Sequence, residues 1–124
     1  MPYEISTEGT FSAAHFLDGY EGDCARLHGH NWRVRVAIRM EDKTSKGFTV
    51  DFRHLKRLIQ QVIKPLDHSV LNELPPFSGM NPTAETIAEW CYNEMVRIID
   101  DDAAEVVKVE VWESLQNCAT YLKE

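Results

Sequence analysis

The sequence lacks several features that would place it in a broad class of proteins. Among its 124 residues, no apolar run approaches the roughly 18–20 residues needed to cross a bilayer. Its first residues show neither the basic start nor the apolar stretch of a signal peptide. The three cysteines, Cys24, Cys91 and Cys118, cannot all pair within one chain, which favours reduced thiols. We therefore expect a cytoplasmic protein with no membrane partner.

Positive charge is also scarce in this sequence. The chain has 13 lysines and arginines against 20 aspartates and glutamates, which gives a formal net charge of −7. Proteins that bind nucleic acid through a basic surface usually carry an excess of lysine and arginine, so we expect no nucleic-acid partner. No repeat or linker-like stretch divides the chain, and its length suits one domain over residues 1–124.

The first third of the sequence has the pattern of two strands. Residues 3–16 fit a first strand, with an irregularity near Gly9. In a second strand from His30 to Met40, the even positions are largely apolar and several odd positions are arginines. This alternation is typical of a half-buried strand. A polar turn is expected at residues 41–47.

The period then changes to that of helices. Apolar residues recur at helical spacing between Phe52 and Leu66, with Asp51 placed to cap the start. After an irregular loop at 73–82, a second helix is expected from about Thr83. Its buried stripe comprises Ile87, Cys91, Met95 and Ile98. Strands at 107–112 and 119–122 complete the order β-β-α-α-β-β, which predicts an α+β fold with an antiparallel sheet and the helices on one face.

Histidines gather at the entrance to the second strand. His28 and His30 lie two residues apart, so both imidazoles point to the same side of the strand, and Gly29 between them would allow a close approach of the backbone. His15, at the end of the first strand, is the natural third ligand if the two strands pair as a hairpin. Three histidines leave a coordination position open, as catalytic zinc sites do. The alternative is a chance histidine pair at an exposed strand end, and the third histidine favours the metal site.

Cys24 and the Asp67-His68 pair also carry chemistry. Cys24 could be a fourth ligand, a nucleophile or base, or a loop thiol; we favour a reactive group, because a nearby dication lowers the pKa of a thiol. Asp67 could fix the tautomer of His68 as a general acid or base, although a histidine that contacts the last carbonyls of a helix explains the pair equally well. Cys91 is expected to be inert core, and the role of Cys118 is undecided.

Glu113 continues the parity of the apolar positions in the third strand and should therefore point to the apolar side. A carboxylate there is costly without partners. Either the strand has emerged into solvent at this point, or Glu113 accepts hydrogen bonds from a ligand. Its two oxygens suit the paired N–H groups of a guanine or a pterin. Both interpretations stay open.

Six segments of the sequence form a recognisable series. In chain order they are Phe11-Ser12-Ala13-Ala14-His15, Cys24-Ala25-Arg26-Leu27-His28-Gly29-His30, Val50-Asp51-Phe52 with Leu55-Lys56, Leu66-Asp67-His68 with Leu71-Asn72, Asn81-Pro82-Thr83-Ala84-Glu85 and Val111-Trp112-Glu113-Ser114. Together these segments resemble the 6-pyruvoyl-tetrahydropterin synthase family, and within it the bacterial 6-carboxy-tetrahydropterin synthase branch. The short Cys-x-x-x-His-Gly-His spacing is typical of the 6-carboxy branch. Ser114 departs from the usual threonine, and Glu21 keeps open a folate-pathway branch that has a glutamate near the cysteine position.

The resemblance implies a tunnelling fold (T-fold), in which subunits join their sheets into a barrel, commonly as a homohexamer of two trimers with pockets between subunits. It also implies a role for each matched residue. His15, His28 and His30 would be Zn²⁺ ligands, Cys24, Asp67 and His68 the acid/base group, Glu113 the pterin anchor, and Thr83 and Glu85 part of the pterin pocket.

The implied activity is that of a zinc-dependent lyase. It would convert 7,8-dihydroneopterin triphosphate to 6-carboxy-5,6,7,8-tetrahydropterin, releasing acetaldehyde and triphosphate on the route to queuosine. The alternatives are the 6-pyruvoyl reaction, which eliminates triphosphate only, and a non-enzymatic zinc- or pterin-binding module. The negative net charge of the protein does not exclude a triphosphate substrate, since a metal ion together with Arg26 or another nearby cation could bind it.

Overall fold

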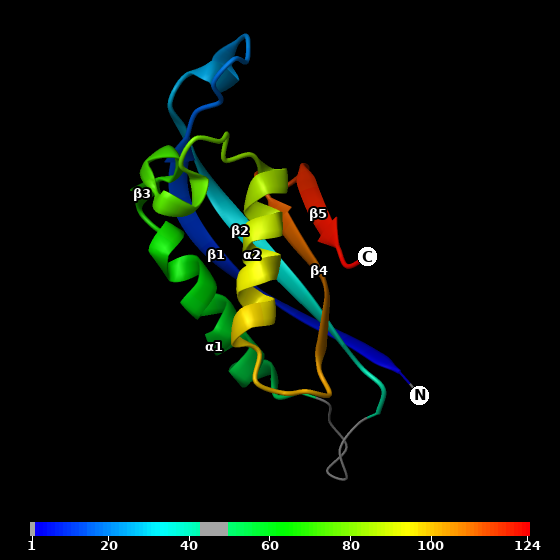
Figure 1. Ribbon diagram of the computed structural model, residues 1–124. Coiled ribbons are helices and arrows are strands. Elements are labelled where there is room, and N and C mark those ends of the chain that lie inside the picture. The colour runs from blue at the N-terminus through cyan, green and yellow to red at the C-terminus, as the bar shows by residue number, and fades with distance from the viewer. Residues whose placement is uncertain (1, 43–49) are drawn as a thin grey trace.

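The computed structural model describes residues 2–42 and 50–124, so most of the turn expected at 41–47 lies outside the described residues. The order of elements follows the sequence prediction with small additions (Figure 1). The strands and α-helices are β1 Tyr3–His15, β2 His28–Met40, α1 Phe52–Ile63, β3 Ser69–Val70, α2 Ala84–Ile98, β4 Glu105–Trp112 and β5 Cys118–Leu122. Short 3₁₀ turns lie at Asp23–Ala25, Lys64–Leu66, Leu71–Glu73 and Pro75–Phe77.

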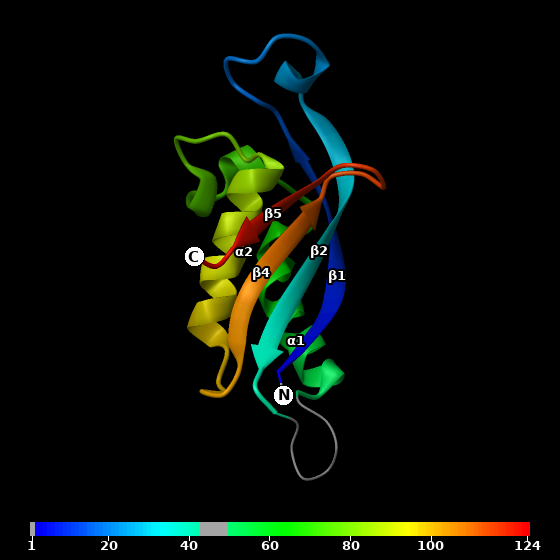
Figure 2. The same cartoon turned by 90° about the vertical axis from the view of Figure 1, so that its right-hand side faces the viewer.

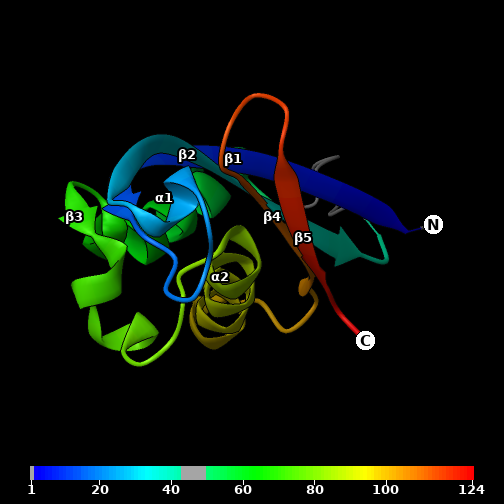
Figure 3. The same cartoon turned by 90° about the horizontal axis from the view of Figure 1, so that it is seen from above.

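The strands form a five-stranded sheet in the order β3-β1-β2-β4-β5, and α1 and α2 cover one face of it (Figures 2 and 3). The pairs β1–β2, β2–β4 and β4–β5 are antiparallel, whereas β3 runs parallel to β1. The sheet is therefore mixed, and the prediction of a purely antiparallel sheet is wrong at this edge. Two residues of β3 are too few to show a strand periodicity in the sequence.

The pairing of β1 with β2 is unbroken from Tyr3 opposite Met40 to His15 opposite His28. The irregularity predicted near Gly9 is therefore absent. Gly9 has another reason to be glycine, because a Cβ at this position would lie 2.9 Å from both Gln60 Nε2 and Ile63 Cδ1 of the α1 region. The helix packs directly over the strand where no side chain intervenes.

The alternation of buried and exposed residues along β4 is interrupted once. Ala37 pairs with Lys108 and Ile38 with Val106, so Val107 is an extra residue in a β-bulge. Val106 is consequently buried and Val107 is only half-buried, contrary to the predicted alternation. Beyond the bulge the predicted parity holds, and Val109 and Val111 are buried.

Both α-helices begin after a capping residue; Asp51 was predicted to cap the first, and Thr83 lies where the second helix was expected to begin. Asp51 Oδ1 accepts a hydrogen bond from the Arg53 amide at 2.8 Å, and Thr83 Oγ1 accepts one from the Thr86 amide at 3.1 Å. Phe52, expected on the apolar stripe of α1, is 58% exposed because it sits in the first turn outside the core. The stripe of α2 is buried at the predicted positions except Ile98, which is half-buried. Within the described residues, no helix is both long and apolar enough to traverse a bilayer.

The connection between β1 and β2, residues 16–27, extends past the ends of both helices (Figure 1). This connection begins directly after His15 and ends directly before His28. The end of the β1–β2 hairpin is therefore the place where the fold gathers the candidate site.

Candidate metal centre and acid–base pair

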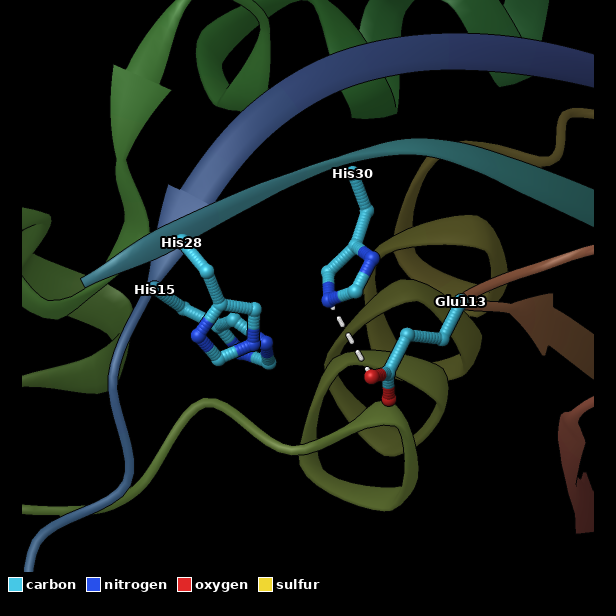
Figure 4. Close-up of side chains that lie close together, drawn as sticks. All are labelled: His15, His28, His30 and Glu113. Atoms are coloured by element: carbon cyan, nitrogen blue, oxygen red, sulfur yellow. Dashed lines mark ion pairs between the residues drawn. The ribbon is translucent and has the colours of Figure 1, made fainter. Parts of the chain in front are cut away.

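Four ligand atoms meet at the end of the β1–β2 hairpin. The ligand atoms of His15, His28, His30 and Glu113 all lie within 4.8 Å of one another (Figure 4). The strand register explains the meeting, because His15 lies opposite His28 and His30 follows two residues later on the same side of β2. The structure thus brings together the three histidines that the sequence predicted at one point.

Hydrogen bonds to backbone carbonyls fix the tautomers of two of these histidines. Nδ1 of His15 donates to the Pro82 carbonyl at 2.8 Å, and Nδ1 of His28 donates to the Arg26 carbonyl at 2.7 Å. A carbonyl can only accept, so both Nδ1 atoms carry the proton and both Nε2 atoms keep a lone pair for a ligand. Within the described residues, Nε2 of His15 and Nε2 of His30 are buried without a hydrogen-bond partner.

Burial beside an apolar ring disfavours the charged form of two of these histidines. His15 is only 1% exposed, and the buried Trp32 ring lies 4.9 Å from the His15 ring and 5.1 Å from the His30 ring. Burial lowers the pKa of His15 and of His30, although the nearby Glu113 carboxylate acts in the opposite direction. The favoured neutral imidazole is the form that binds a metal.

Glu113 belongs to the same cluster. Its Oε1 lies 3.1 Å from Nε2 of His30, and its side chain is 32% exposed. The carboxylate therefore points toward the histidines, as the strand parity predicted, instead of emerging fully into solvent. Three imidazoles and a carboxylate are donors that divalent zinc accepts, and the buried Nε2 of His15, which has no hydrogen-bond partner among the described residues, needs such a partner. The cluster is consistent with a metal centre.

Asp67 and His68 form a separate pair at the outer edge of β1. Asp67 Oδ1 accepts the Ser12 amide at 2.9 Å, and its Oδ2 lies 2.9 Å from Nδ1 of His68. The Ser12 amide first, and the His68 side chain second, hold the pKa of Asp67 below its usual value. The two neighbours therefore do touch, which the sequence alone left open.

The backbone of His68 is unusual. Its φ of 57° lies in the left-handed region, which side chains other than glycine rarely adopt. The His68 amide donates to the Ser12 carbonyl at 2.6 Å, so pairing with β1 holds this conformation. The imidazole, 83% exposed, keeps Nε2 directed away from Asp67, as a general acid or base requires.

Cys24 lies in the 3₁₀ turn Asp23–Ala25 and is a half-buried free thiol. Its Sγ is not part of the four-residue ligand cluster. Cys91 is fully buried, as predicted, and burial raises the pKa of its thiol. Cys118 is exposed at the start of β5.

Two asparagines hold the connection that carries Cys24. Asn72 accepts from the Phe16 amide at 3.0 Å and donates to the Phe16 carbonyl at 2.9 Å. Asn81 makes the same pair of bonds to Asp18, at 2.8 and 2.9 Å. Between them, the Leu17 amide donates to the Cys24 carbonyl at 2.9 Å. These clamps fix the path of the chain from His15 towards Cys24.

The segment before α2 contributes to the site in an unexpected way. Thr83 Oγ1 is engaged as the helix cap, and Glu85 is exposed in the first turn of α2. Neither belongs to the ligand cluster. Pro82, which sequence reasoning did not select, supplies the carbonyl that orients His15.

The model of the family described as 6-pyruvoyl tetrahydropterin synthase matches residues 4–124. The chain belongs to this family. It is 35% identical over 122 residues to 6-carboxy-5,6,7,8-tetrahydropterin synthase of Synechocystis sp., covering 94% of this chain and 91% of the relative. It is 33% identical over 113 residues to dihydroneopterin monophosphate aldolase of Pyrococcus furiosus, covering 91% of each.

The fold agrees with that of the family. The structure of Caenorhabditis elegans 6-pyruvoyl tetrahydropterin synthase matches with a TM-score of 0.88 at 24% identity, covering 100% of this chain and 97% of that one. The family resemblance inferred from the sequence motifs is therefore confirmed, and the chain is a family enzyme, a lyase. The cluster of three histidines and a glutamate is consistent with a metal site typical of that family.

Proposed function

We propose that the protein is a zinc-dependent 6-carboxy-5,6,7,8-tetrahydropterin synthase, acting on 7,8-dihydroneopterin triphosphate on the route to queuosine. The observation that carries the proposal is the histidine cluster, in which His15 and His28 each present Nε2 through a fixed tautomer. The similarity to the Synechocystis relative of that name supports the choice of reaction. One water molecule is consumed, because the side-chain carbon that remains after loss of triphosphate and acetaldehyde needs a second oxygen to become a carboxyl group. Reduction of the ring from dihydro to tetrahydro balances the oxidation of that carbon.

His15, His28 and His30 would hold the zinc and leave one position open for substrate oxygen. A bound zinc would supply Lewis acidity toward the hydroxyls of the substrate side chain. Glu113 would accept the paired N–H groups of the pterin ring, which orients the side chain toward the metal. Thr83 and Glu85 would line the same pocket, and the Pro82 carbonyl keeps His15 in place.

Proton transfer falls to the thiol and to the carboxylate–imidazole pair. Cys24, as thiolate, would take a proton from the side-chain carbon or hydroxyl. Asp67 accepts a hydrogen bond from the Nδ1–H group of His68, which leaves Nε2 of His68 able to accept or deliver a proton. Both groups are needed, because moving hydrogen between side chain and ring requires removal at one atom and delivery at another.

The exposed acid–base pair supports a site that is completed by a neighbouring subunit. Within the described residues, β3 covers only Ala13 and Ala14 at the outer edge of β1, and β5 pairs on one side only. Joining these open edges between copies would close the sheets into the T-fold barrel, as a hexamer of two trimers. His68, exposed beside that edge, would then face the neighbour's site. Each chain would contribute one domain, residues 1–124, to a cytoplasmic enzyme.

A second candidate has a specific observation in its favour. The Pyrococcus relative is named a dihydroneopterin monophosphate aldolase, and its identity of 33% is close to that of the Synechocystis relative. An aldolase would cleave the side chain without forming a carboxyl group. The family's 6-pyruvoyl reaction would retain all three side-chain carbons.

Substrate choice separates these activities. The metal-loaded protein would be incubated in parallel with the triphosphate and the monophosphate of 7,8-dihydroneopterin, and the pterin products identified by mass spectrometry. We expect 6-carboxy-tetrahydropterin from the triphosphate and little turnover of the monophosphate. Preferred cleavage of the monophosphate would establish the aldolase, and a three-carbon diketone product the 6-pyruvoyl reaction.

A further inference from the structure

The segment that precedes α2 lies against the metal centre and supplies none of its ligands. Residues 78–83 connect the 3₁₀ turn Pro75–Phe77 to α2, at the end of the molecule where the β1–β2 hairpin ends (Figure 1). Within this segment Pro82 is buried and Asn81 is half-buried. The Pro82 carbonyl accepts the hydrogen bond from Nδ1 of His15 at 2.8 Å, so the position of this carbonyl decides how the ligand is oriented.

Helix α2 holds the Pro82 carbonyl from one side. Thr83 caps the helix, and its carbonyl accepts a hydrogen bond from the Ile87 amide at 2.9 Å. The Thr83 amide in turn donates to the Asn81 carbonyl at 2.9 Å, which closes a three-residue turn around Pro82. A proline at the centre suits such a turn, because its ring restricts φ to about −65°.

Asn81 holds the same carbonyl from the other side. Its Oδ1 accepts from the Asp18 amide at 2.8 Å, and its Nδ2 donates to the Asp18 carbonyl at 2.9 Å. Asp18 comes three residues after His15 on the same stretch of chain. The two stretches of chain are therefore joined at a second point, besides the bond between the His15 ring and Pro82.

Two points of attachment restrain the Pro82 carbonyl more than one does. With the His15 bond alone, the segment before α2 could rotate about that bond and carry the carbonyl out of line. The paired bonds to Asp18 oppose this motion, and both go to backbone groups. His15 depends on the restraint because it is only 1% exposed, so water cannot readily replace a lost acceptor at Nδ1. Without the carbonyl, nothing would favour the tautomer that leaves Nε2 free for a ligand.

We propose that Asn81 is a positioning residue of the metal centre, which keeps His15 in the Nδ1–H tautomer by holding the Pro82 carbonyl in place. The inference rests on the metal centre of the proposed function and is independent of which pterin reaction the protein catalyses. Loss of a hydrogen-bond partner of a metal-binding histidine typically weakens metal affinity by about 10–100-fold. Asn81 acts one residue beyond that partner, so we expect an effect at the lower end of this range.

Asn81→Ala is the test variant, and Asn72→Ala is the matched control. Asn72 makes the same two bonds to the backbone of this connection, at Phe16, and does not belong to the segment that carries Pro82. Zinc affinity would be measured by competition with a chromophoric chelator. We expect Kd to rise about tenfold in Asn81→Ala, equivalent to about 1.4 kcal/mol, and to change by less than about twofold in Asn72→Ala.

The tautomer is read from the ring nitrogens of the metal-free protein. NMR of protein labelled with ¹⁵N-histidine, at about pH 8 where imidazoles are neutral, distinguishes a protonated from an unprotonated Nδ1. The His15 signals are those missing from His15→Gln. We expect the proton on Nδ1 in the wild type and in Asn72→Ala, and a mixture of both tautomers in Asn81→Ala. A merely structural role of Asn81 would not change this signature.

Three outcomes would overturn the assignment. These are unchanged zinc affinity in Asn81→Ala, equal losses in the test and control variants, and a weaker affinity with the His15 tautomer unchanged. Thermal unfolding shows whether each variant is folded. If Asn81→Ala does not fold, Pro82→Gly, which retains the carbonyl and frees the backbone, should show the same loss of affinity and the same mixture.

Failure of the proposed function is distinguishable from failure of this inference. If the variants behave as expected and the zinc-loaded wild type turns over no pterin, the lyase function fails while the positioning role stands. If the wild type turns over the pterin and Asn81→Ala binds zinc as tightly as the wild type, the positioning role fails alone. A wild type that binds no zinc would contradict both.

Discussion

Replacing His28 by alanine should remove most of the zinc affinity. His28 is half-buried at the start of β2, and its hydrogen bond is to the Arg26 carbonyl, so the variant should fold. Four-ligand zinc sites bind with about 10–16 kcal/mol, and one ligand's share is about 3 kcal/mol. We therefore expect Kd to rise by about two orders of magnitude. Cys24→Ala should leave Kd nearly unchanged, because the thiol lies outside the ligand cluster.

The assay combines elemental analysis of the purified variants with zinc competition against a chromophoric chelator. His54→Ala is the matched histidine control, since His54 pairs with Asp100 and is not in the cluster. Turnover should be lost in His28→Ala together with the metal, and lost in Cys24→Ala with the metal still bound. Equal loss of zinc from Cys24→Ala would refute the assignment of the thiol as a reactive group beside a three-histidine centre.

Three further predictions concern the site and the fold. Glu113→Gln should retain zinc and raise KM for the pterin about tenfold or more, by loss of a charged hydrogen-bond partner; loss of the metal would make Glu113 a ligand instead. Gly9→Ala should lower the free energy of unfolding by about 1–3 kcal/mol because its Cβ would meet α1 at 2.9 Å, whereas Gly29→Ala, with nothing nearer than 3.9 Å, should unfold like the wild type in urea. Burial lowers the pKa of His15 and His30 below 6.5, so the unfolded chain takes up protons first as the pH falls. The free energy of unfolding of the metal-free protein should therefore be highest above about pH 6.5 and should fall as the pH drops toward the lowered pKa values of these two histidines. A urea midpoint that rises as the pH is lowered from about 7.5 to about 5.5 would contradict this.

Much of the fold follows from periodicity and capping residues. The alternation in β2, the cap at Asp51 and the start of a helix near Thr83 depend on neighbouring residues, so they could be predicted from the sequence. The bulge at Val107 and the two-residue β3 depend on pairing with distant strands, which leaves no local pattern. The close approach of the backbone predicted at Gly29 is not found there, and it occurs at Gly9, where α1 crosses β1. The contact again depends on an element distant in the sequence.

The candidate site divides in the same way. His15, His28 and His30 were predictable because strand pairing alone brings them together. The hydrogen bond from His15 to the Pro82 carbonyl and the packing of Trp32 against His15 could not be predicted, since a backbone acceptor and a core aromatic ring have no distinguishing pattern in the sequence.

Asn72 and Asn81 belong to the segments that carry the family resemblance, but the sequence did not indicate their hydrogen bonds to Phe16 and Asp18. The path of residues 16–18 decides which backbone groups Asn72 and Asn81 meet, and that path is a property of the whole fold. The contact between Asp67 and His68 likewise depends on the left-handed backbone at His68.

The most direct measurement of the central claim is the product ratio from 7,8-dihydroneopterin triphosphate. Metal-loaded wild-type protein should release acetaldehyde and triphosphate in equal amounts, each matched by one 6-carboxy-5,6,7,8-tetrahydropterin, and Cys24→Ala with bound zinc should release neither. Triphosphate release without acetaldehyde, or no turnover by the zinc-loaded wild type, would contradict the account.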